Sequence, residues 1–295
     1  MTGITTIIIT LDEERNLRYA IDSVSGWSDI LVVDSGSTDR TIEIAESMGA
    51  RVLHHTFLDY ASQRNWAMEN DPFGNEWILF LDADEVIFSE LRDEIIATIA
   101  NTDCDGFYLK RRFYFMGRWI KYGGQYPAWF LRLFKKGKGV YERNVNEHVN
   151  LTGKVGYLRN DFADINRNGV GAWVAKHNRY AEMEALELVR FNQRRAKKQN
   201  DPMARLFGSQ AERKRWIREY VWNLLLPPLV RPFCFFLYYY VLRLGLFDGR
   251  AGLIYGVLHG FWYHFLIDVK FIELSSRGRD GESSQIPSGN TAASE

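Results

Sequence analysis

The sequence has few of the features that mark specialised classes of protein. Its 295 residues include only two cysteines, Cys104 and Cys234, which belong to no Cys-x-x-Cys or Cys/His pattern. This excludes a disulfide framework and a structural zinc site, and it favours a reducing, cytoplasmic setting. The N-terminus lacks a basic segment followed by an apolar stretch and a cleavage site, so we expect no secretory signal.

An excess of charge of one sign is absent as well. The 37 basic and 37 acidic side chains give a net charge of zero. This balance excludes a generally basic nucleic-acid binder, so we expect no nucleic-acid partner. The charges are unevenly placed, because residues 1–105 contain 21 acidic and 6 basic side chains and the compensating positive charge follows later. We expect the two parts of the chain to meet different partners.

No apolar run is long enough for a simple membrane-spanning helix. The longest uncharged run, residues 251–267, has 17 residues, whereas a spanning helix needs roughly 20 apolar residues. Residues 176–218 contain twelve basic side chains, which suit an anionic lipid surface. The sequence therefore favours monotopic or re-entrant attachment to an anionic membrane. The alternative is an aromatic helical subdomain packed on the enzyme or on a second subunit, and a homo-oligomer is left open.

What the sequence does contain is a regular alternation of two patterns in its first hundred residues. Short β-branched or apolar runs of strand length alternate with segments of helical spacing. This order predicts an α/β fold that is Rossmann-like, with a mostly parallel central sheet and helices on both faces. Short aromatic strands between residues 106 and 168 should complete the sheet. The loops that follow the parallel strands should gather at one edge of the sheet.

Acidic side chains follow two of these predicted strands. The apolar run 77–81 ends in Asp82 and Asp84, and Asp34 follows the apolar run 30–33. Alternation along an extended chain lets Asp82 and Asp84 point the same way, toward a divalent cation or a ribose. Acidic residues at strand ends are also common as turn formers or helix caps, which is the alternative. Neither a G-x-G-x-x-G nor a P-loop motif follows these strands, which counts against those two classes.

Four motifs in this order resemble family 2 glycosyltransferases with the GT-A fold. They are Thr10-Leu11-Asp12-Glu13-Glu14, Val33 to Asp39, Gln63-Arg64-Asn65, and Leu81-Asp82-Ala83-Asp84-Glu85. Arg132-Leu133-Phe134 and Val145-Asn146-Glu147-His148 extend the likeness to about residue 190. It is closest to the branch that contains lipopolysaccharide-core β-1,4-glucosyltransferases.

The resemblance implies a role for each matched residue. Thr10 and Glu13 line the nucleotide pocket, and Asp34 holds the base. Arg64 and Asn65 contact the nucleoside or its phosphates. Asp82 lies near the ribose, and Asp84 together with Asp82 binds Mg²⁺ or Mn²⁺ at the diphosphate. Arg132 alternates with apolar residues, so a strand can aim it at the diphosphate; a structural ion pair is the alternative.

Glu147 is the candidate general base. An inverting transfer needs a carboxylate that takes the proton from the acceptor hydroxyl as it attacks the anomeric carbon. If Glu147 is only an exposed acid, Asp161 and Asp164 are the substitutes.

Together these observations predict an inverting, metal-dependent glycosyltransferase. It would move a hexose from a nucleotide sugar, UDP-linked, to a membrane-associated glycan or lipid-linked acceptor in cell-envelope polysaccharide synthesis. Its place would be the cytoplasmic face of the inner membrane, as a peripheral or monotopic protein. Transfer to a polyprenyl phosphate and a noncatalytic membrane scaffold are the alternatives. We expect a GT-A domain over residues 1–198, a helical membrane-association region over 199–275, and a disordered tail over 276–295.

Overall fold

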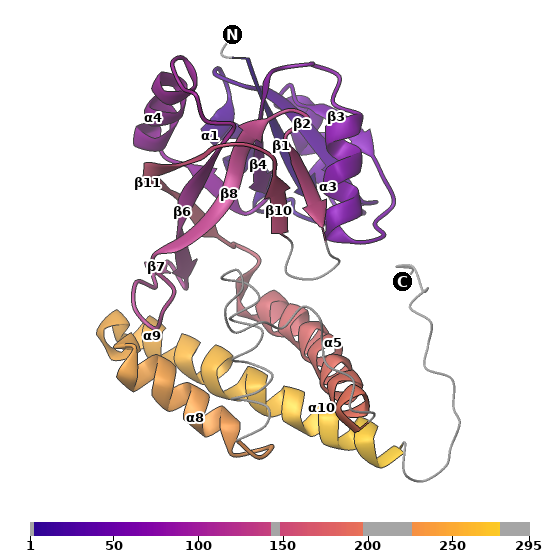
Figure 1. The fold of residues 1–295 in the computed structure, drawn as a ribbon, viewed down its shortest axis with the longest axis vertical. Coiled ribbons are helices and arrows are strands. Elements are labelled where there is room, and N and C mark those ends of the chain that lie inside the picture. Colours follow the sequence, from indigo (N-terminus) through magenta and orange to yellow (C-terminus); the bar gives the residue numbers. More distant parts are fainter. Residues whose placement is uncertain (1–2, 143–147, 197–225, 278–295) are drawn as a thin grey trace. The chain divides into compact units, whose positions relative to one another are not determined.

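The computed structural model describes residues 3–142, 148–196 and 226–277 (Figure 1). The chain forms two compact units. The first contains Met1–Ala172 and Arg243–Leu253, and the second contains Trp173–Leu242 and Ile254–Glu295. The division at Ala172 falls within the helix α5 (Gly169–Ala196), whose Trp173 ring packs against the rings of Tyr255 and Trp262 in the second unit.

The first unit follows the predicted alternation of strands and helices. Its first part consists of β1 (Ile4–Thr10), α1 (Leu17–Val24), β2 (Asp29–Asp34), α2 (Thr41–Ser47), β3 (Arg51–His54), α3 (Tyr60–Glu69), β4 (Trp77–Asp82), β5 (Glu85–Ile87) and α4 (Ser89–Ile99). The aromatic part adds β6 (Gly106–Phe115), β7 (Arg118–Trp119), β8 (Ala128–Lys135), β9 (Gly139–Glu142), β10 (His148–Leu151) and β11 (Val155–Ile165).

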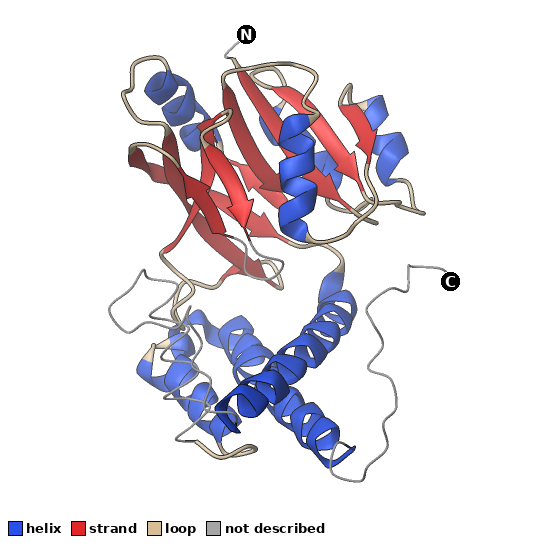
Figure 2. Cartoon of the chain, turned by 45° about the vertical axis from the view of Figure 1, so that its right-hand side comes forward, coloured by secondary structure: helices blue, strands red, loops and turns tan. Residues whose placement is uncertain are grey.

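The strands form one large sheet and one small one (Figure 2). The large sheet has the order β3-β2-β1-β4-β8-β6-β11-β5, with β7 paired to β6. Its first four strands are parallel, as predicted. Beyond β4 the sheet is mixed, because β8 runs antiparallel to both β4 and β6. The small sheet pairs β9 with β10.

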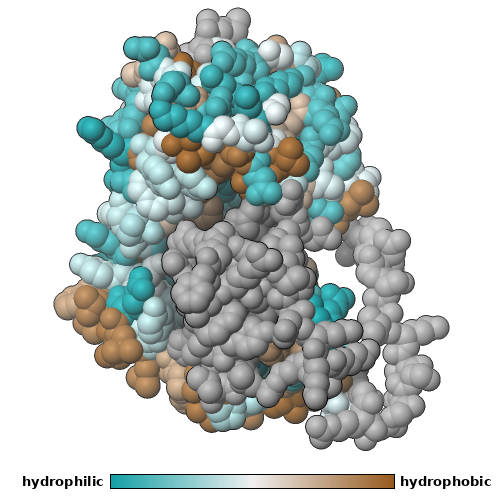
Figure 3. All heavy atoms as spheres, in the orientation of Figure 1, coloured by the Kyte–Doolittle hydropathy of each residue, from teal (hydrophilic) through white to brown (hydrophobic). Residues whose placement is uncertain are grey.

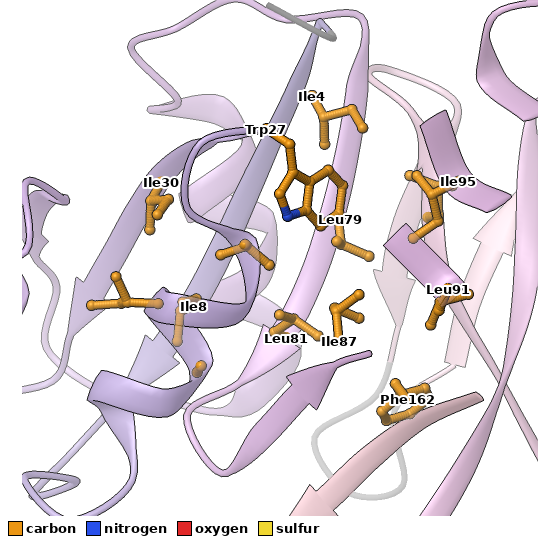
Figure 4. Packing of buried hydrophobic residues seen from close by; sticks show 14 of the residues in the cluster. Ile4, Ile8, Trp27, Ile30, Leu79, Leu81, Ile87, Leu91, Ile95 and Phe162 are labelled. Carbon is orange, nitrogen blue, oxygen red and sulfur yellow. The ribbon is translucent and has the colours of Figure 1, made fainter. Parts of the chain in front are cut away.

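Helices cover both faces of the large sheet, in agreement with the prediction. On one face, α1 and α4 bury residues such as Ile21 and Ile95 against Ile8 and Leu79 (Figure 4). On the other face, α3 packs against residues that include Ile7. Because β1 is buried on both faces, its run of isoleucine and threonine needs no polar alternation. Each such isoleucine contributes about 1.5–3 kcal/mol on burial.

The C-terminal part is helical. It contains α5 (Gly169–Ala196), α8 (Arg231–Leu237), the π-helix η2 (Tyr238–Leu242), the 3-10 helix η3 (Gly245–Asp248), α9 (Gly249–Tyr255), the π-helix η4 (Gly256–Tyr263) and α10 (His264–Arg277). In the second unit, a buried ion pair between Arg231 and Asp268 joins α8 to α10. Among the helices that the structure describes, none combines the length and apolar character needed to cross a bilayer.

The segment Arg243–Leu253 belongs to the first unit because it is held by the loop after β7. The buried Asp248 carboxylate accepts the backbone N–H groups of Lys121 at 3.1 Å and Tyr122 at 2.9 Å. The backbone N–H of Gly123 donates to the carbonyl of Arg243 at 2.9 Å. These bonds fix the turn between the C-terminal helices to the sheet domain.

Candidate functional site

The ends of β1 and β2 lie side by side, as the parallel sheet requires. Thr10 is opposite Asp34 in the register, and the N–H of Ser35 donates to the carbonyl of Thr10. Thr10 is buried, and its hydroxyl has no hydrogen-bond partner among the residues that the structure describes. A buried hydroxyl without a partner is costly unless a ligand satisfies it. Thr10 therefore fits the predicted nucleotide pocket.

The carboxylate of Asp34, at the end of β2, is turned into the loop that follows the strand. This carboxylate is fully buried and accepts the N–H groups of Gly36 at 2.8 Å and Ser37 at 2.9 Å, and the hydroxyl of Ser37 at 2.5 Å. Gly36 has φ +102°, a conformation that side chains rarely adopt. In this conformation Asp34 shapes the loop after β2.

Glu13 is tied to the segment that follows β11. Its Oε2 accepts the side-chain amides of Asn16 at 2.6 Å and Asn168 at 3.1 Å, and its N–H donates to Thr41 Oγ1 at 2.8 Å. Asn16 in turn accepts the N–H of Arg167 at 2.8 Å. The loop after β1 is therefore positioned by a segment about 150 residues later in the chain.

Two neighbouring residues of the helix α3, Arg64 and Asn65, contact different strands. Arg64 is buried and pairs with Asp82 at 2.7 Å, so it reaches the predicted carboxylate edge. Asn65 instead binds the backbone of Tyr141, because its amide donates to the carbonyl and accepts the N–H, each at 2.9 Å. Asn65 thus holds β9 against α3.

Asp82 ends β4 between two buried arginines. Its Oδ1 pairs with Arg64 and its Oδ2 pairs with Arg132 at 2.8 Å, while Arg132 also pairs with Glu85 at 2.6 Å. Burial raises the pKa of Glu85 well above its usual value, against the lowering effect of Arg132. Burial acts to lower the pKa of Arg132, but Asp82 and Glu85 raise it, so Arg132 stays charged. The structure thus shows the ion pair that was the alternative for Arg132, and the contact with a diphosphate stays a prediction.

Asp84 has separate partners. Its Oδ2 accepts the amide of Asn166 at 2.9 Å, and its carbonyl accepts the N–H of Ile165 at 2.8 Å. Within the described part of the chain, no group of three or more His, Cys, Asp or Glu side chains could hold a metal. Mg²⁺ is usually held by one or two carboxylates together with substrate phosphates. Asp84 and Asp82 would supply two such carboxylates. To bind the ion, Asp82 would have to release Arg64 and Arg132.

Of the three candidate bases, Asp161 and Asp164 lie in the part of the chain that the structure describes, and both form ion pairs. Glu147 lies outside the described residues. Asp161 is buried and pairs with Arg112 at 2.7 Å and Lys110 at 3.2 Å. Asp164 pairs with Arg111 at 3.1 Å and lies opposite Glu85 in the sheet register.

The sequence predicted no role at the site for three residues that the structure places there, namely Glu85, Asn166 and Asn168. Glu85 follows the two aspartates directly, so its position was a usable signal. The two asparagines gave no local signal, because their partners Asp84 and Glu13 lie far away in the sequence. Tyr141 is also buried beside the arginines, and burial raises its pKa to about 12.

Comparison with known proteins decides the family. Residues 5–165 match the family model described as glycosyl transferase family 2. The chain belongs to this family. The match covers β1 to β11, so all the described members of the carboxylate and arginine cluster lie within the matched region of this glycosyltransferase. The family predicted from the motifs is confirmed.

Two curated relatives of the glycosyltransferase are similar over about two thirds of its length. The uncharacterized glycosyltransferase RP128 of Rickettsia prowazekii is 32% identical over 209 residues, which cover 64% of this chain and 69% of that protein. The lipopolysaccharide core biosynthesis glycosyltransferase LpsC of Rhizobium meliloti is 28% identical over 200 residues, covering 65% of this chain and 73% of that protein.

Two solved structures are similar at lower identity. Glucosyl-3-phosphoglycerate synthase from Mycobacterium tuberculosis, solved with Mn²⁺, UDP and glucosyl-3-phosphoglycerate, is 21% identical with a TM-score of 0.32, and the match covers 38% of this chain and 44% of that one. Staphylococcus aureus TarS, residues 1–349, is 14% identical with a TM-score of 0.44, covering 96% and 93% of the two chains.

Proposed function

We propose that this glycosyltransferase is an inverting, metal-dependent enzyme that transfers a hexose from a UDP-linked sugar to a glycan or lipid-linked acceptor of the cell envelope. The observation that carries the proposal is the cluster at the end of β4, where Asp82 pairs with two buried arginines, Arg64 and Arg132, two residues before Asp84. The name of the relative LpsC, which refers to lipopolysaccharide core biosynthesis, supports this acceptor class.

The cluster suits the handling of a leaving diphosphate. Buried arginines offer several N–H donors in a fixed plane, and they bind phosphate oxygens well. In the unliganded arrangement these donors are held by Asp82 and, for Arg132, by Glu85. A bound divalent ion would neutralise charge on the diphosphate as it leaves. Arg64 and Arg132 would then turn from Asp82 to the phosphate oxygens, while Glu85 keeps Arg132 in place.

Proton removal from the acceptor is assigned to Glu147 from the sequence. A positioned base contributes roughly 10²–10⁴-fold to such a transfer. We therefore expect Glu147→Gln to abolish most of the turnover while leaving donor binding intact.

A thermal unfolding screen tests the proposal. UDP-, GDP- and dTDP-sugars are each added with Mn²⁺, and the midpoint of unfolding is measured. A UDP-sugar should raise the midpoint in the wild-type protein and not in Asp84→Ala. Asp93→Ala, which removes an exposed acid on α4, is the matched control and should keep the stabilisation. If no nucleotide sugar raises the midpoint of the wild-type protein, the proposed function is wrong.

We also propose that the enzyme works on the cytoplasmic face of the inner membrane. The turn Arg243–Leu253 exposes large apolar side chains, namely Leu244, Leu246, Phe247 and Leu253, of which Phe247 is 58% exposed. Figure 3 shows apolar surface (brown) at the lower left, where Figure 1 labels α9. Arg243 and Arg250 in the same turn are exposed, and so are Arg118 and Lys121 in and after β7. An apolar tip with a basic rim suits an anionic bilayer surface.

A further inference from the structure

An exposed aromatic cluster lies on β6, β8 and β11. The ring of Tyr157 stacks on Tyr108 with centroids 5.1 Å apart, and it meets Trp129 edge to face at 5.0 Å. Trp129 is 39% exposed and Tyr157 is 61% exposed. Large rings are normally buried, so an exposed pair in ordered contact marks a binding surface.

Polar groups beside these rings are held in fixed positions. Lys110 lies 5.5 Å from the centre of the Trp129 ring and 5.9 Å from that of Tyr126. The buried carboxylate of Asp161 fixes this arrangement, since it pairs with Lys110 and Arg112 and accepts the Tyr126 hydroxyl at 3.3 Å. Two cations and one carboxylate leave one positive charge beside the aromatic pair.

We propose that Trp129 and Tyr157 form a platform that binds a sugar ring of the acceptor glycan. A pyranose has an apolar face of C–H groups and a rim of hydroxyls. Aromatic rings cover the apolar face, while Lys110 and the Tyr126 hydroxyl meet the rim. Ligand sites of this kind combine aromatic walls with a few fixed polar groups.

The sheet order favours the acceptor over the donor as the occupant. The loops after β1 and β2, with Thr10 and Asp34, lie on one side of β4. The platform strands β8, β6 and β11 lie on the other side. Strand β6 takes part in both groups of contacts, because Lys110 faces the platform while the adjacent Arg111, on the opposite face of the sheet, pairs with Asp164, which lies opposite Glu85 in the register. A sugar on the platform would therefore leave the loops after β1 and β2 free for the donor.

Saturation-transfer NMR tests the platform directly, and it needs no turnover. The probes are the core oligosaccharide released from lipopolysaccharide by mild acid and the methyl glycosides of glucose, galactose and mannose. The wild-type enzyme should saturate the ring protons of at least one probe. Trp129→Ala and Tyr157→Ala should each weaken that binding about tenfold, as expected for the loss of a central aromatic contact. Trp129→Phe, which keeps a ring, should restore most of it.

The controls separate this inference from the proposed function on which it rests. Phe73→Ala removes an exposed ring between α3 and β4 and should leave sugar binding unchanged. Stabilisation by the nucleotide sugar should be the same in all these variants, so donor binding is scored independently. The proposal is overturned if no probe binds the wild type, or if the two alanine variants bind as well as Phe73→Ala. It is equally overturned if these variants change only the oligomeric state, since the platform would then be a contact between copies.

Discussion

Asp82 and Asp84 show that the spacing of two residues in the sequence does not determine which partners they contact. The spacing of Asp82 and Asp84 predicts a shared metal site, yet the structure gives them separate partners. Asp82 is held by Arg64 and Arg132, whereas Asp84 is held by Asn166. A cation at this site therefore competes with two arginines for Asp82. Metal and donor should bind together, because the diphosphate can take over the arginines that Asp82 releases.

Removal of Arg132 should strongly destabilise the fold. Arg132→Met leaves the buried Glu85 without its ion-pair partner, and a broken buried pair costs about 3–5 kcal/mol. Urea denaturation at pH 7 measures the change in the free energy of unfolding. Arg92→Met breaks an exposed pair with Asp93 and should cost about 0–1 kcal/mol. If both variants lost the same free energy of unfolding, the buried Arg132–Glu85 pair would contribute no more to stability than the exposed Arg92–Asp93 pair.

At the scale of the element, the glycines of the C-terminal helices are not equivalent. A Cβ at Gly252 would lie 2.5 Å from the carbonyl oxygen of Gly245 and 2.5 Å from Cβ of Asp248. A Cβ at Gly256 would lie at ordinary distance from the rings of Tyr240 and Phe236, 3.4 Å and 3.5 Å away. Gly252 is thus required by a close approach of the backbone, whereas Gly256, four residues later, has room for a methyl group.

Two alanine variants distinguish these positions. Gly252→Ala should lower the free energy of unfolding by about 1–3 kcal/mol, because the clash involves backbone that cannot move aside cheaply. Gly256→Ala should be neutral or stabilising by up to about 1 kcal/mol, since alanine is the better helix former. Chemical denaturation of both variants measures the difference. The interpretation fails if Gly252→Ala is as stable as Gly256→Ala.

The histidines of the second unit should make its stability depend on pH. Burial and the neighbouring His177 lower the pKa of His259 to about 4, and burial with His259 and Arg231 lowers the pKa of His264 to about 3. An unfolded histidine titrates near 6.5, so the unfolded chain binds more protons between pH 6.5 and 4. The stabilising effect is complete above pH 6.5 and is lost as the pH falls toward 4.

Circular dichroism of urea-induced unfolding between pH 7 and 4 measures this effect. His259→Phe should reduce the acid-induced loss of stability by at most about 3 kcal/mol, which corresponds to the size of the pKa shift. The control is Leu58→Ala, which changes an exposed side chain of the first unit that does not titrate, and its pH profile should match that of the wild type. A wild-type slope in His259→Phe would contradict the assignment.

At the scale of the whole molecule, the zero net charge is the sum of an acidic first part and a basic second part. The acidic first 105 residues include Asp82 and Asp84, while the later part supplies the basic rim of the apolar turn. A uniform partner of one charge is thereby excluded. The distribution suits an enzyme that binds a metal and a nucleotide at one place and an anionic surface at another.

Sedimentation with lipid vesicles tests the surface assignment. The wild-type enzyme should bind vesicles that contain phosphatidylglycerol, and binding should weaken as salt rises. Leu246→Ser combined with Phe247→Ser should weaken binding at least about tenfold, since each buried side chain contributes about 1.5–3 kcal/mol. Leu58→Ser removes an exposed leucine elsewhere and serves as control. Equal binding by all three proteins would disprove the role of the turn.

The sequence alone determined the parts of this glycosyltransferase that depend on local periodicity. The alternation of apolar runs and helical segments predicted the parallel strands β1 to β4 and helices on both faces. The ends of these strands located Thr10, Asp34 and Asp82 at one edge. The motifs were sufficient for the family, because their residue types follow strands in a fixed order.

Only the tertiary structure decided which partner each of these side chains meets. Asn65 binds the backbone of Tyr141, 76 residues later, and Asn168 reaches back to Glu13. The insertion of the antiparallel strand β8 between β4 and β6 likewise escaped prediction. Periodicity reports which face of an element is buried. Long-range hydrogen bonds, ion pairs and strand order are selected by the packing of distant segments, which no local pattern records.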